Sequence, residues 1–367
     1  MLKEPALLPH LELLMPNANR IISLGNRRLV ATPVFDTYWR FAVARQRLFS
    51  ARVRGEAPPW TDDPILLEHR FTNAYRASDR VSQYLIRNVI YSGQRNAEEV
   101  VFRTLLFKLF NRTATWELLV DALGDVPTWR TFDRERYACV LDAAMTRGVR
   151  LYSAAYIMPS PAFGSPRKHR NHLELLEVMM KEGLPRRLGQ TKALEEVFKI
   201  LLAYPSLGDF LAFQFAIDLN YSEVINFNEM DFVVAGPGAK GGISKCFADT
   251  GGLDEREVIR EVTAMADDEF DRLDLCFERI GGTRPLQLID CQNLFCETDK
   301  YARVAHPEFT GVSGRTRIKQ RFTAHGDVPP EFYPPKWGIN RASNAVAAVA
   351  PRERAQLQLQ LPFALAL

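Results

Sequence analysis

The sequence predicts a mainly α-helical protein. Few of its segments alternate polar and apolar side chains with the period of two that is typical of strands. Several segments instead place apolar residues three or four positions apart, and residues 98–110 are apolar on almost every side. Because the last pattern is typical of a central buried helix, we expect helices to form the core and the sheet content to be small.

The elements at the start of the chain follow from its prolines and aromatic residues. Residues 1–34 are expected to be a loosely ordered lead-in, because four prolines interrupt any long helix there. A helix with an aromatic face is predicted over 35–50. Thr61 or Asp62 can then cap a helix that has a proline in its first turn, and we expect this helix to run over 65–90.

The rest of the chain is interpreted mainly from its apolar spacing. Further helices are predicted at 116–123, 134–146, 172–181, 191–203, 207–219 and 254–279. A flexible basic loop is expected at 159–170. We assign residues 35–340 to one helical domain and expect the tail, 341–367, to be either disordered or a terminal helix.

Composition excludes some classes of protein. The net charge of +3 does not by itself indicate a nucleic-acid binder, although the arginines are clustered along the chain. No stretch reaches membrane-spanning length and the N-terminus has no signal-peptide pattern, so a cytoplasmic protein without a membrane partner is expected. The five cysteines include no CxxC pair, and we predict neither a metal site nor a cofactor.

A glycine-rich turn at 236–242 follows a short apolar run and precedes a predicted helix start. Backbone N–H groups at such a turn can bind a phosphate. A nucleotide-kinase loop would need GxxxxGK[ST] and a dinucleotide fold would need GxGxxG after a strand, so neither fits. A helix-hairpin-helix near 222–247 fits the layout, and the alternative is a turn whose glycines serve geometry alone. The residues that would contact a DNA backbone are Gly236, Gly238, Lys240 and Gly241.

The segment 286–303 is predicted to be a helix rich in polar side chains. Those that could carry chemistry are Asp290, Gln292, Asn293, Glu297, Asp299 and Lys300. With 3.6 residues per turn, Asp290, Asn293 and Glu297 lie along one face. A carboxylate there could stabilise an oxocarbenium-like sugar or orient a water, as cleavage of an N-glycosidic bond requires. The alternative is a solvated face with ion pairs such as that of Glu297 with Lys300.

The predicted helix after Trp60 is rich in arginine. Its arginines are Arg70, Arg76, Arg80 and Arg87, and Asn73 and Tyr75 stand among them. Guanidinium groups pair with phosphates and aromatic rings stack on bases, so this pattern is typical of contact with nucleic acid. An amphipathic surface helix with a few salt bridges would show the same pattern.

Four motifs, in this order along the chain, resemble a known protein family. They are PWTDDPILLEHRFTNAYRASDRVSQYLI, VFRTLLFKLFN, DFVVAGPGAKGGI and DCQNLFCETDKYAR. The sequence from about residue 35 to residue 337 resembles DNA-base hypermodification proteins, which include the helical domain of 5-hydroxymethyl-deoxyuridine (5-hmdU) DNA kinases and the α-glutamyl/putrescinyl-thymine pyrophosphorylases. The resemblance implies a relation to helix-hairpin-helix DNA glycosylases, and therefore two helical lobes with a cleft between them.

The resemblance also implies roles for two of the segments above. Gly236, Gly238 and Lys240 look like the DNA-binding hairpin, and Asp290 looks like the helix-start aspartate of the glycosylases. The gap between hairpin and aspartate is longer than in glycosylases, so Glu297 and Asp299 stay as rival acids. The kinase phosphate loop of some relatives is missing, so the resemblance does not imply phosphorylation by these residues.

Together these patterns predict a DNA glycosylase that flips a 5-hydroxymethyl-derived pyrimidine, with or without an attached sugar, out of the stack and excises it. Its DNA could be that of a bacteriophage, with a role in defence. Asp290, Glu297 or Asp299 would assist loss of the base. The predicted base-pocket or phosphate contacts are Trp60, Arg70, Asn73, Arg76, Arg80, Gln292, Asn293 and Lys300. Two alternatives stay open: transfer of an amine or amino acid to the base with displacement of pyrophosphate, and a non-catalytic DNA-binding module.

Overall fold

The computed structural model describes residues 19–154, 157–323 and 329–340. These residues hold 14 α-helices, a few short 3-10 or π turns and one sheet of three short strands. The predicted mainly α-helical fold class is confirmed. The predicted tail, 341–367, and the first part of the predicted lead-in lie outside the described residues.

The sheet lies partly in residues predicted to be a loose lead-in. β1 (Arg20–Leu24) pairs antiparallel with β2 (Arg27–Ala31), which pairs in turn with β3 (Phe247–Asp249). The two-residue turn of Gly25 and Asn26 is a hairpin signal in the sequence, and Gly25 adopts a φ of 57°. The lead-in prediction is therefore wrong for this hairpin, whose second strand buries side chains in the core.

The helix predicted to have an aromatic face is α1 (Pro33–Val53). Thr32 caps it, because its hydroxyl oxygen accepts a hydrogen bond from the Val34 N–H at 3.2 Å. Phe35 and Trp39 are fully buried, and their rings meet edge to face at a centroid distance of 5.9 Å. The later helices pack on this aromatic face, so α1 supports much of the core.

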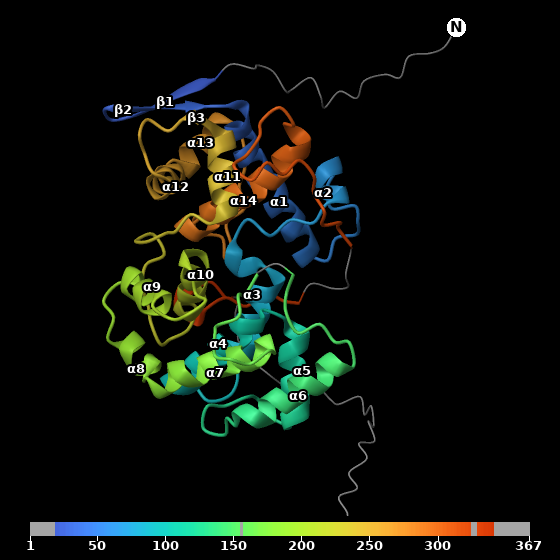
Figure 1. Cartoon of the computed structure of the whole chain (residues 1–367). Helices are drawn as coiled ribbons and strands as arrows, with labels where there is room; N and C mark the ends of the chain where they lie inside the picture. Colours follow the sequence, from blue (N-terminus) through green and yellow to red (C-terminus); the bar gives the residue numbers. More distant parts are fainter. Residues whose placement is uncertain (1–18, 155–156, 324–328, 341–367) are drawn as a thin grey trace, which may run out of the picture.

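The helices form two groups, at the top and bottom of Figure 1. The upper group contains the sheet, α1, α2 (Pro64–Glu68), α11 (Pro237–Cys246), α12 (Glu255–Ala264), α13 (Ala266–Arg272) and α14 (Leu288–Ala305). The lower group contains α4 (Ala97–Phe110), α5 (Thr113–Leu123), α6 (Arg134–Thr146), α7 (Lys168–Lys181), α8 (Leu184–Gly189) and α9 (Leu194–Leu202). α3 (Arg80–Tyr84) lies between the groups, and α10 (Asp209–Asn220) packs beside α9 at the upper edge of the lower group. One continuous hydrophobic core runs through the described parts of both groups.

The single helix predicted over 65–90 is broken into short pieces. After α2 come a 3-10 turn (η1, Arg76–Ser78), α3 and a π turn (η2, Leu85–Ile90). Between α2 and η1 the backbone pairs with a distant segment, since the Arg70 N–H donates to the Gln320 carbonyl at 3.1 Å. Tertiary hydrogen bonds therefore override the helical pattern of the sequence here.

The predicted helix-hairpin-helix does not form in the expected way. α10 ends at Asn220, α11 begins at Pro237, and the residues between them contain no helix. The Asn220 side chain shapes this connection, because it bonds to both the N–H and the carbonyl of Phe227. The glycine-rich turn is followed directly by a helix, α11, but no helix directly precedes it. The relation to helix-hairpin-helix glycosylases is therefore not confirmed.

Candidate functional site

The polar face of α14 packs against a loop of the chain. Asp290, Asn293 and Glu297 share one face, as predicted, and all three bond to residues 72–76. The Asp290 Oδ1 accepts a hydrogen bond from the Arg76 N–H at 2.8 Å. The Glu297 Oε2 accepts from the Thr72 N–H at 3.0 Å, and Asn293 donates to the Thr72 hydroxyl at 2.9 Å. This face of α14 therefore fixes the path of the loop.

Asp290 lies in the first turn of α14. Its Oδ2 accepts a hydrogen bond from the Gln287 N–H at 2.9 Å, which completes a capping box. Burial and the nearby charge of Glu229 raise the pKa of Asp290 to about 7, against the effects of its two N–H donors and of Arg284. A carboxyl group with a pKa near neutrality can gain or lose a proton under physiological conditions.

Asp290 belongs to a polar group inside the protein, which we call the junction cluster because α14, α10 and α4 meet there. Its members are Arg76, Lys108, Gln214, Asp218, Glu229, Arg284 and Asp290. The Arg76 Nη1 lies 2.8 Å from the Asp218 Oδ1, and the Lys108 Nζ lies 2.8 Å from the Asp218 Oδ2. Burial would raise the pKa of Asp218, but these two cations outweigh it and lower that pKa. Arg76, predicted to contact phosphate, thus points into the interior and is 4% exposed.

The other two candidate acids on α14 form ion pairs. The Lys300 Nζ lies 2.6 Å from the Glu297 Oε2. Asp299 is paired with Arg303 at 2.5 Å and with Lys245 at 3.3 Å. The ion pairs of the alternative interpretation are therefore formed, but Glu297 and Asp299 are buried rather than solvated. The catalytic assignment of the three acids stays a prediction.

The glycines of the turn bring α11 against α14. A Cβ at Gly238 would lie 2.2 Å from the Cys296 Sγ, and one at Gly242 would lie 2.0 Å from the Phe295 carbonyl oxygen. A Cβ at Gly241 would lie 3.0 Å from the Asp299 Oδ1. Glycine is thus required at these positions by the close packing of the two helices. This agrees with the alternative interpretation, in which the glycines of the turn serve geometry alone.

The start of α11 carries the remaining residues predicted to bind a DNA backbone. Gly236 is the N-cap and has no side-chain cap. A Cβ at Gly236 would lie 2.7 Å from the Phe210 ring and 3.4 Å from the Gln292 Nε2, so Gln292 is buried beside the turn. Lys240 is exposed and pairs with Glu255 at 3.4 Å. DNA contact by Gly236, Gly238, Lys240 and Gly241 stays a prediction.

A second polar group lies where α1, the 69–75 loop and α3 meet. We call Arg45, Arg52, Arg70 and Arg80 the arginine cluster. The Arg45 Nη2 donates to the Asn73 Oδ1, and the Asn73 N–H donates to the Asp79 Oδ1 at 2.7 Å. The Arg52 guanidinium lies over the Trp60 ring, 5.0 Å from its centroid. Trp60 thus lies beside Arg52 and Asn73 beside Arg45, whereas Arg76 belongs to the junction cluster. Contact of Trp60, Arg70, Asn73 or Arg80 with a base or phosphate stays a prediction.

Positive charge accumulates in the arginine cluster. The pKa of Arg45 is lowered to about 10, mainly by burial and also by the charge of Arg52, although Asp79 and Glu297 oppose the change. Burial and the charge of Arg80 lower the pKa of Arg52. Burial and the charge of Arg70 lower the pKa of Arg80. These shifts show that neighbouring guanidinium groups repel one another.

Arg45, Arg52 and Asp79 were not predicted as site residues from the sequence. Arg45 and Arg52 are seven residues apart and share a face of α1, so helical spacing could have paired them. Their approach to Arg80 depends on the tertiary fold, which no local pattern contains. Burial raises the pKa of Asp79 to about 6, with Glu297 adding to the rise and Arg45 opposing it.

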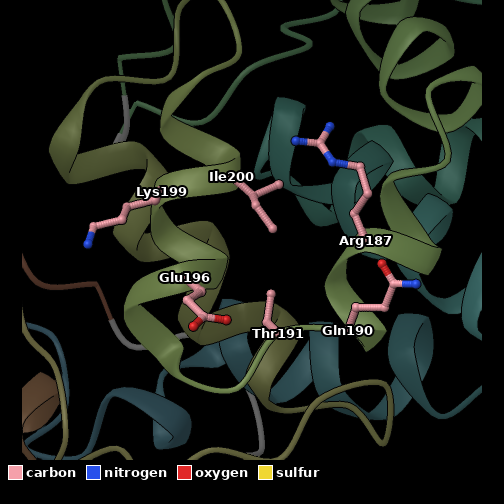
Figure 2. A pocket seen from close by; sticks show the side chains of 6 residues that line it. All are labelled: Arg187, Gln190, Thr191, Glu196, Lys199 and Ile200. Atoms are coloured by element: carbon pink, nitrogen blue, oxygen red, sulfur yellow. The ribbon is translucent and has the colours of Figure 1, made fainter.

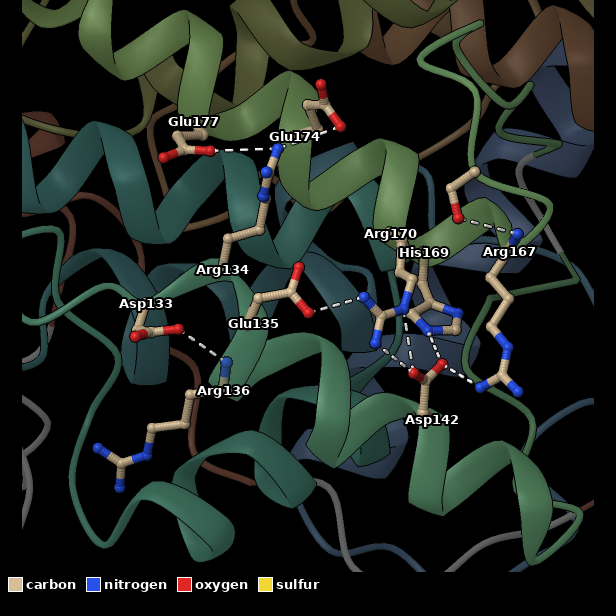
Figure 3. A network of polar contacts seen from close by, with 11 residues as sticks. Asp133, Arg134, Glu135, Arg136, Asp142, Arg167, His169, Arg170, Glu174 and Glu177 are labelled. Carbon is tan, nitrogen blue, oxygen red and sulfur yellow. Dashed lines mark hydrogen bonds and ion pairs between the residues drawn. The ribbon is translucent and has the colours of Figure 1, made fainter.

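The basic loop predicted at 159–170 is organised differently. α7 begins at Lys168, and Figure 3 shows Arg167, His169 and Arg170 gathered around Asp142 of α6. The distances from Asp142 are 2.6 Å to the His169 Nε2 and 2.7 Å to the Arg170 Nη2. Hydrogen bonds from these side chains overcome the effect of burial and lower the pKa of Asp142 to about 2. The positive charge here is already balanced by acids of the protein.

Two shallow hollows lie away from both clusters. Figure 2 shows the first, between α8 and α9, where Thr191 and Ile200 face the open space and Lys199 points away. The second lies beside α11 and β3 and is lined by Lys240, Asp254 and neighbouring residues. Neither lies between the two groups of helices, so they do not form the predicted cleft.

No group of three or more His, Cys, Asp or Glu side chains among the described residues is arranged to hold a metal ion. No described helix is both long and apolar enough to cross a membrane.

Comparison with known proteins places the chain in a class of DNA-base hypermodification proteins. Residues 32–311 match the family described as the helical domain of 5-hmdU DNA kinase, and the chain belongs to this family. A curated relative, the 5-hmdU DNA kinase of Bacillus phage SP10, is 28% identical over 288 residues, which cover 73% of this chain and 45% of that protein. The chain therefore spans less than half of this relative. No solved structure matches it.

The prediction of a DNA glycosylase is wrong. Both the family and the relative carry the name of a DNA kinase, which is a phosphotransfer enzyme of base modification and not a hydrolase of N-glycosyl bonds. The open alternative of a base-modifying enzyme fits the comparisons better.

Proposed function

We propose that this chain is the helical part of a DNA-base hypermodification enzyme. It engages DNA that contains 5-hydroxymethyl-deoxyuridine and supports group transfer at the 5-hydroxymethyl group, while the base stays attached to its sugar. The observation that carries the proposal is the family match, because residues 32–311 include both the junction cluster and the arginine cluster. The relative named for the same substrate supports it.

The phosphate donor is not assigned to these residues. The sequence contains no GxxxxGK[ST] loop, which holds the phosphates of a nucleotide in many kinases. The chain therefore contributes recognition of DNA and of the modified base to the proposed function. The arginine cluster supplies positive charge for the DNA, and the bacteriophage source of the relative suggests phage DNA as the substrate.

Asp290 and Glu297 act in this proposal as positioning residues. They hold the backbone N–H groups of Arg76 and Thr72, on either side of Asn73. Asn73 in turn accepts a hydrogen bond from Arg45. The acids of α14 thus determine where the loop presents Arg70 and Asn73, which are candidates for contact with DNA.

Binding of modified and unmodified DNA tests the proposal. Fluorescence anisotropy would compare oligonucleotides, single- and double-stranded, that carry one 5-hydroxymethyluracil or one thymine at the same position. We expect about tenfold tighter binding of the modified DNA, since a well-placed hydrogen bond to one hydroxyl contributes about 1 kcal/mol or slightly more. Alkali treatment after incubation should leave the strands intact. Equal affinity for the two DNAs would contradict the proposal. Strand breaks after alkali treatment would show that the base is excised, which would also contradict it.

A variant tests the predicted DNA contact at the start of α11. Lys240→Gln should weaken binding of both DNAs equally and reduce the salt slope by about one unit, as loss of one phosphate contact does. Lys192→Gln is the matched control, because Lys192 is an exposed lysine of the lower group. Unchanged DNA binding by Lys240→Gln would contradict a contact between the start of α11 and DNA.

A further inference from the structure

We propose that Arg45, Arg52, Arg70 and Arg80 form a binding site for a phosphate oxyanion, with Trp60 at its edge. The inference rests on the proposed function, because it names the chemical group that the chain recognises in or on DNA. That group is either an internucleotide phosphodiester or a terminal phosphate, such as one carried by a modified base. The shared chemistry is a tetrahedral phosphate held by guanidinium forks.

The charges around the cluster carry the inference. No carboxylate of the described residues lies within ion-pair distance of the guanidinium groups of Arg45, Arg70 or Arg80. The nearest acids have other partners, since Glu297 pairs with Lys300 at 2.6 Å and Asp79 accepts from the Asn73 N–H. Asp79 and Glu297 act on Arg45 only from beyond ion-pair distance, so a bound anion would offset the remaining repulsion between these like charges.

The geometry also favours a bound group. The Arg45 Nη1 is buried and has no hydrogen-bond partner among the described residues, although its Nη2 is fixed by Asn73. A buried donor without an acceptor is unusual in a folded protein. Arg70 and Arg80 are exposed, so a ligand can approach from solvent. The cluster thus combines one oriented, unsatisfied donor with accessible cations.

The Asp142 network is the contrasting case, in which acids of the protein neutralise the arginines. There Arg167 and Arg170 meet a carboxylate at 2.5 and 2.7 Å, and Arg170 also pairs with Glu135 at 2.8 Å. In the arginine cluster, Arg45, Arg70 and Arg80 have no such pairing with an acid of the described residues. Trp60, with its ring beneath Arg52, can stack on a base beside the phosphate.

The experiment compares the full chain with the double variant Arg70→Gln/Arg80→Gln. Both residues are exposed, so the variant should fold. Arg47→Gln is the control, because Arg47 is exposed on α1 about 200° around the helix from Arg45. Two readouts are needed: the rise in Tm caused by inorganic pyrophosphate, and the affinity for thymine DNA by anisotropy as a function of salt.

A terminal-phosphate site predicts that pyrophosphate raises the Tm of the wild type and of Arg47→Gln but not of the double variant. A backbone site predicts no effect of pyrophosphate, about 10- to 100-fold weaker DNA binding by the double variant, and a salt slope reduced by one to two units. Either result supports the inference and identifies the source of the phosphate. If the double variant matches the wild type in both readouts, the inference is overturned.

The proposed function can fail independently of this site. Loss of any preference for 5-hydroxymethyluracil with retained binding of phosphate would contradict the function and leave the site intact. The opposite outcome is a preference for 5-hydroxymethyluracil that persists in the double variant, together with unchanged pyrophosphate and salt readouts. That outcome would contradict the phosphate site and leave the proposed function intact.

Discussion

Arg76 and Arg80 are four residues apart in the sequence and belong to opposite kinds of polar group. Arg76 enters the junction cluster, where Asp218 and Gln214 accept its hydrogen bonds at 2.8 Å. Arg80 stays exposed in the arginine cluster beside other cations. A buried charge is stable only when it is paired, whereas exposed like charges remain able to bind an ion of opposite charge. The same residue type therefore stabilises the fold at one position and is available for a ligand at the other.

The largest expected effect is on stability at the junction cluster. Arg76→Ala should lower the free energy of unfolding by about 3–5 kcal/mol, because it leaves Asp218 buried with Lys108 alone. Arg80→Ala should change it by no more than about 0.5 kcal/mol. Urea unfolding followed by circular dichroism would measure both. Similar losses in the two variants would remove the distinction between the clusters.

The next effect concerns the pH dependence of stability. The folded pKa of Asp290 is about 7 against an ordinary value of 3.8, so the folded state binds more protons between about pH 4 and pH 7. Stability contributed by the protonated carboxyl should therefore fall as the pH rises through this window, by at most ~4 kcal/mol at about 1.4 kcal/mol per pKa unit.

Asp290→Asn isolates this contribution, because its side chain cannot ionise. The fall in stability between pH 4 and pH 7, measured by urea unfolding, should be smaller in the variant than in the wild type. Asp142→Asn is the contrasting control: the pKa of Asp142 is about 2, so its contribution is lost on acidification instead. Identical pH profiles for wild type and Asp290→Asn would show that the carboxyl does not titrate in this range.

The same comparison shows how far the sequence could predict the site. The shared face of Asp290, Asn293 and Glu297 follows from helical period alone, and the structure confirms it. The break in the helix predicted over 65–90 could not be predicted from helical period, because the Thr72 N–H donates its hydrogen bond to Glu297, 225 positions later in the sequence. A local pattern gives Arg76 and Arg80 the same helical surroundings. Only the tertiary contacts decide which of them is buried.

The family motifs predicted more than the chemistry did. They led to the DNA-base hypermodification family, which the comparisons confirm. They also suggested a glycosylase mechanism, which is wrong, because the matching family and the relative are named for a DNA kinase. The glycine-rich turn and the aspartate at a helix start also have structural roles here. Gly238 and Gly242 permit contact with α14, and Asp290 completes a capping box. Residue types that serve a catalytic site in one protein can serve packing in another.

The third prediction tests this packing role of the turn. Gly242→Ala would place a Cβ 2.0 Å from the Phe295 carbonyl oxygen, so α11 must move away from α14. We expect a loss of about 1–3 kcal/mol in unfolding free energy, as overpacked sites show. Gly189→Ala is the control, because no atom lies within 4 Å of the added Cβ, and it should be neutral or slightly stabilising. A stable Gly242→Ala protein that has lost DNA binding would instead favour a direct phosphate contact by the turn.

The smallest expected effect concerns Asp79, the acid beside the arginine cluster. Burial, with the charge of Glu297, raises its pKa to about 6, while the Asn73 N–H, Arg45 and Arg76 hold the rise back. Above pH 6 its negative charge competes with a bound anion, so affinity for sulfate, which stays doubly charged throughout, should fall about two- to tenfold between pH 5 and pH 7.

Asp79→Asn should abolish this dependence and keep the higher affinity at both pH values, since its amide oxygen can still accept from the Asn73 N–H. Protection of the full chain against thermal unfolding by sulfate would measure the change, with Arg70→Gln/Arg80→Gln as the variant in which sulfate has no effect. A wild-type affinity that is independent of pH would place Asp79 outside the electrostatic reach of the ligand. Stronger binding at pH 7 than at pH 5 would contradict the predicted repulsion between the Asp79 carboxylate and the bound anion.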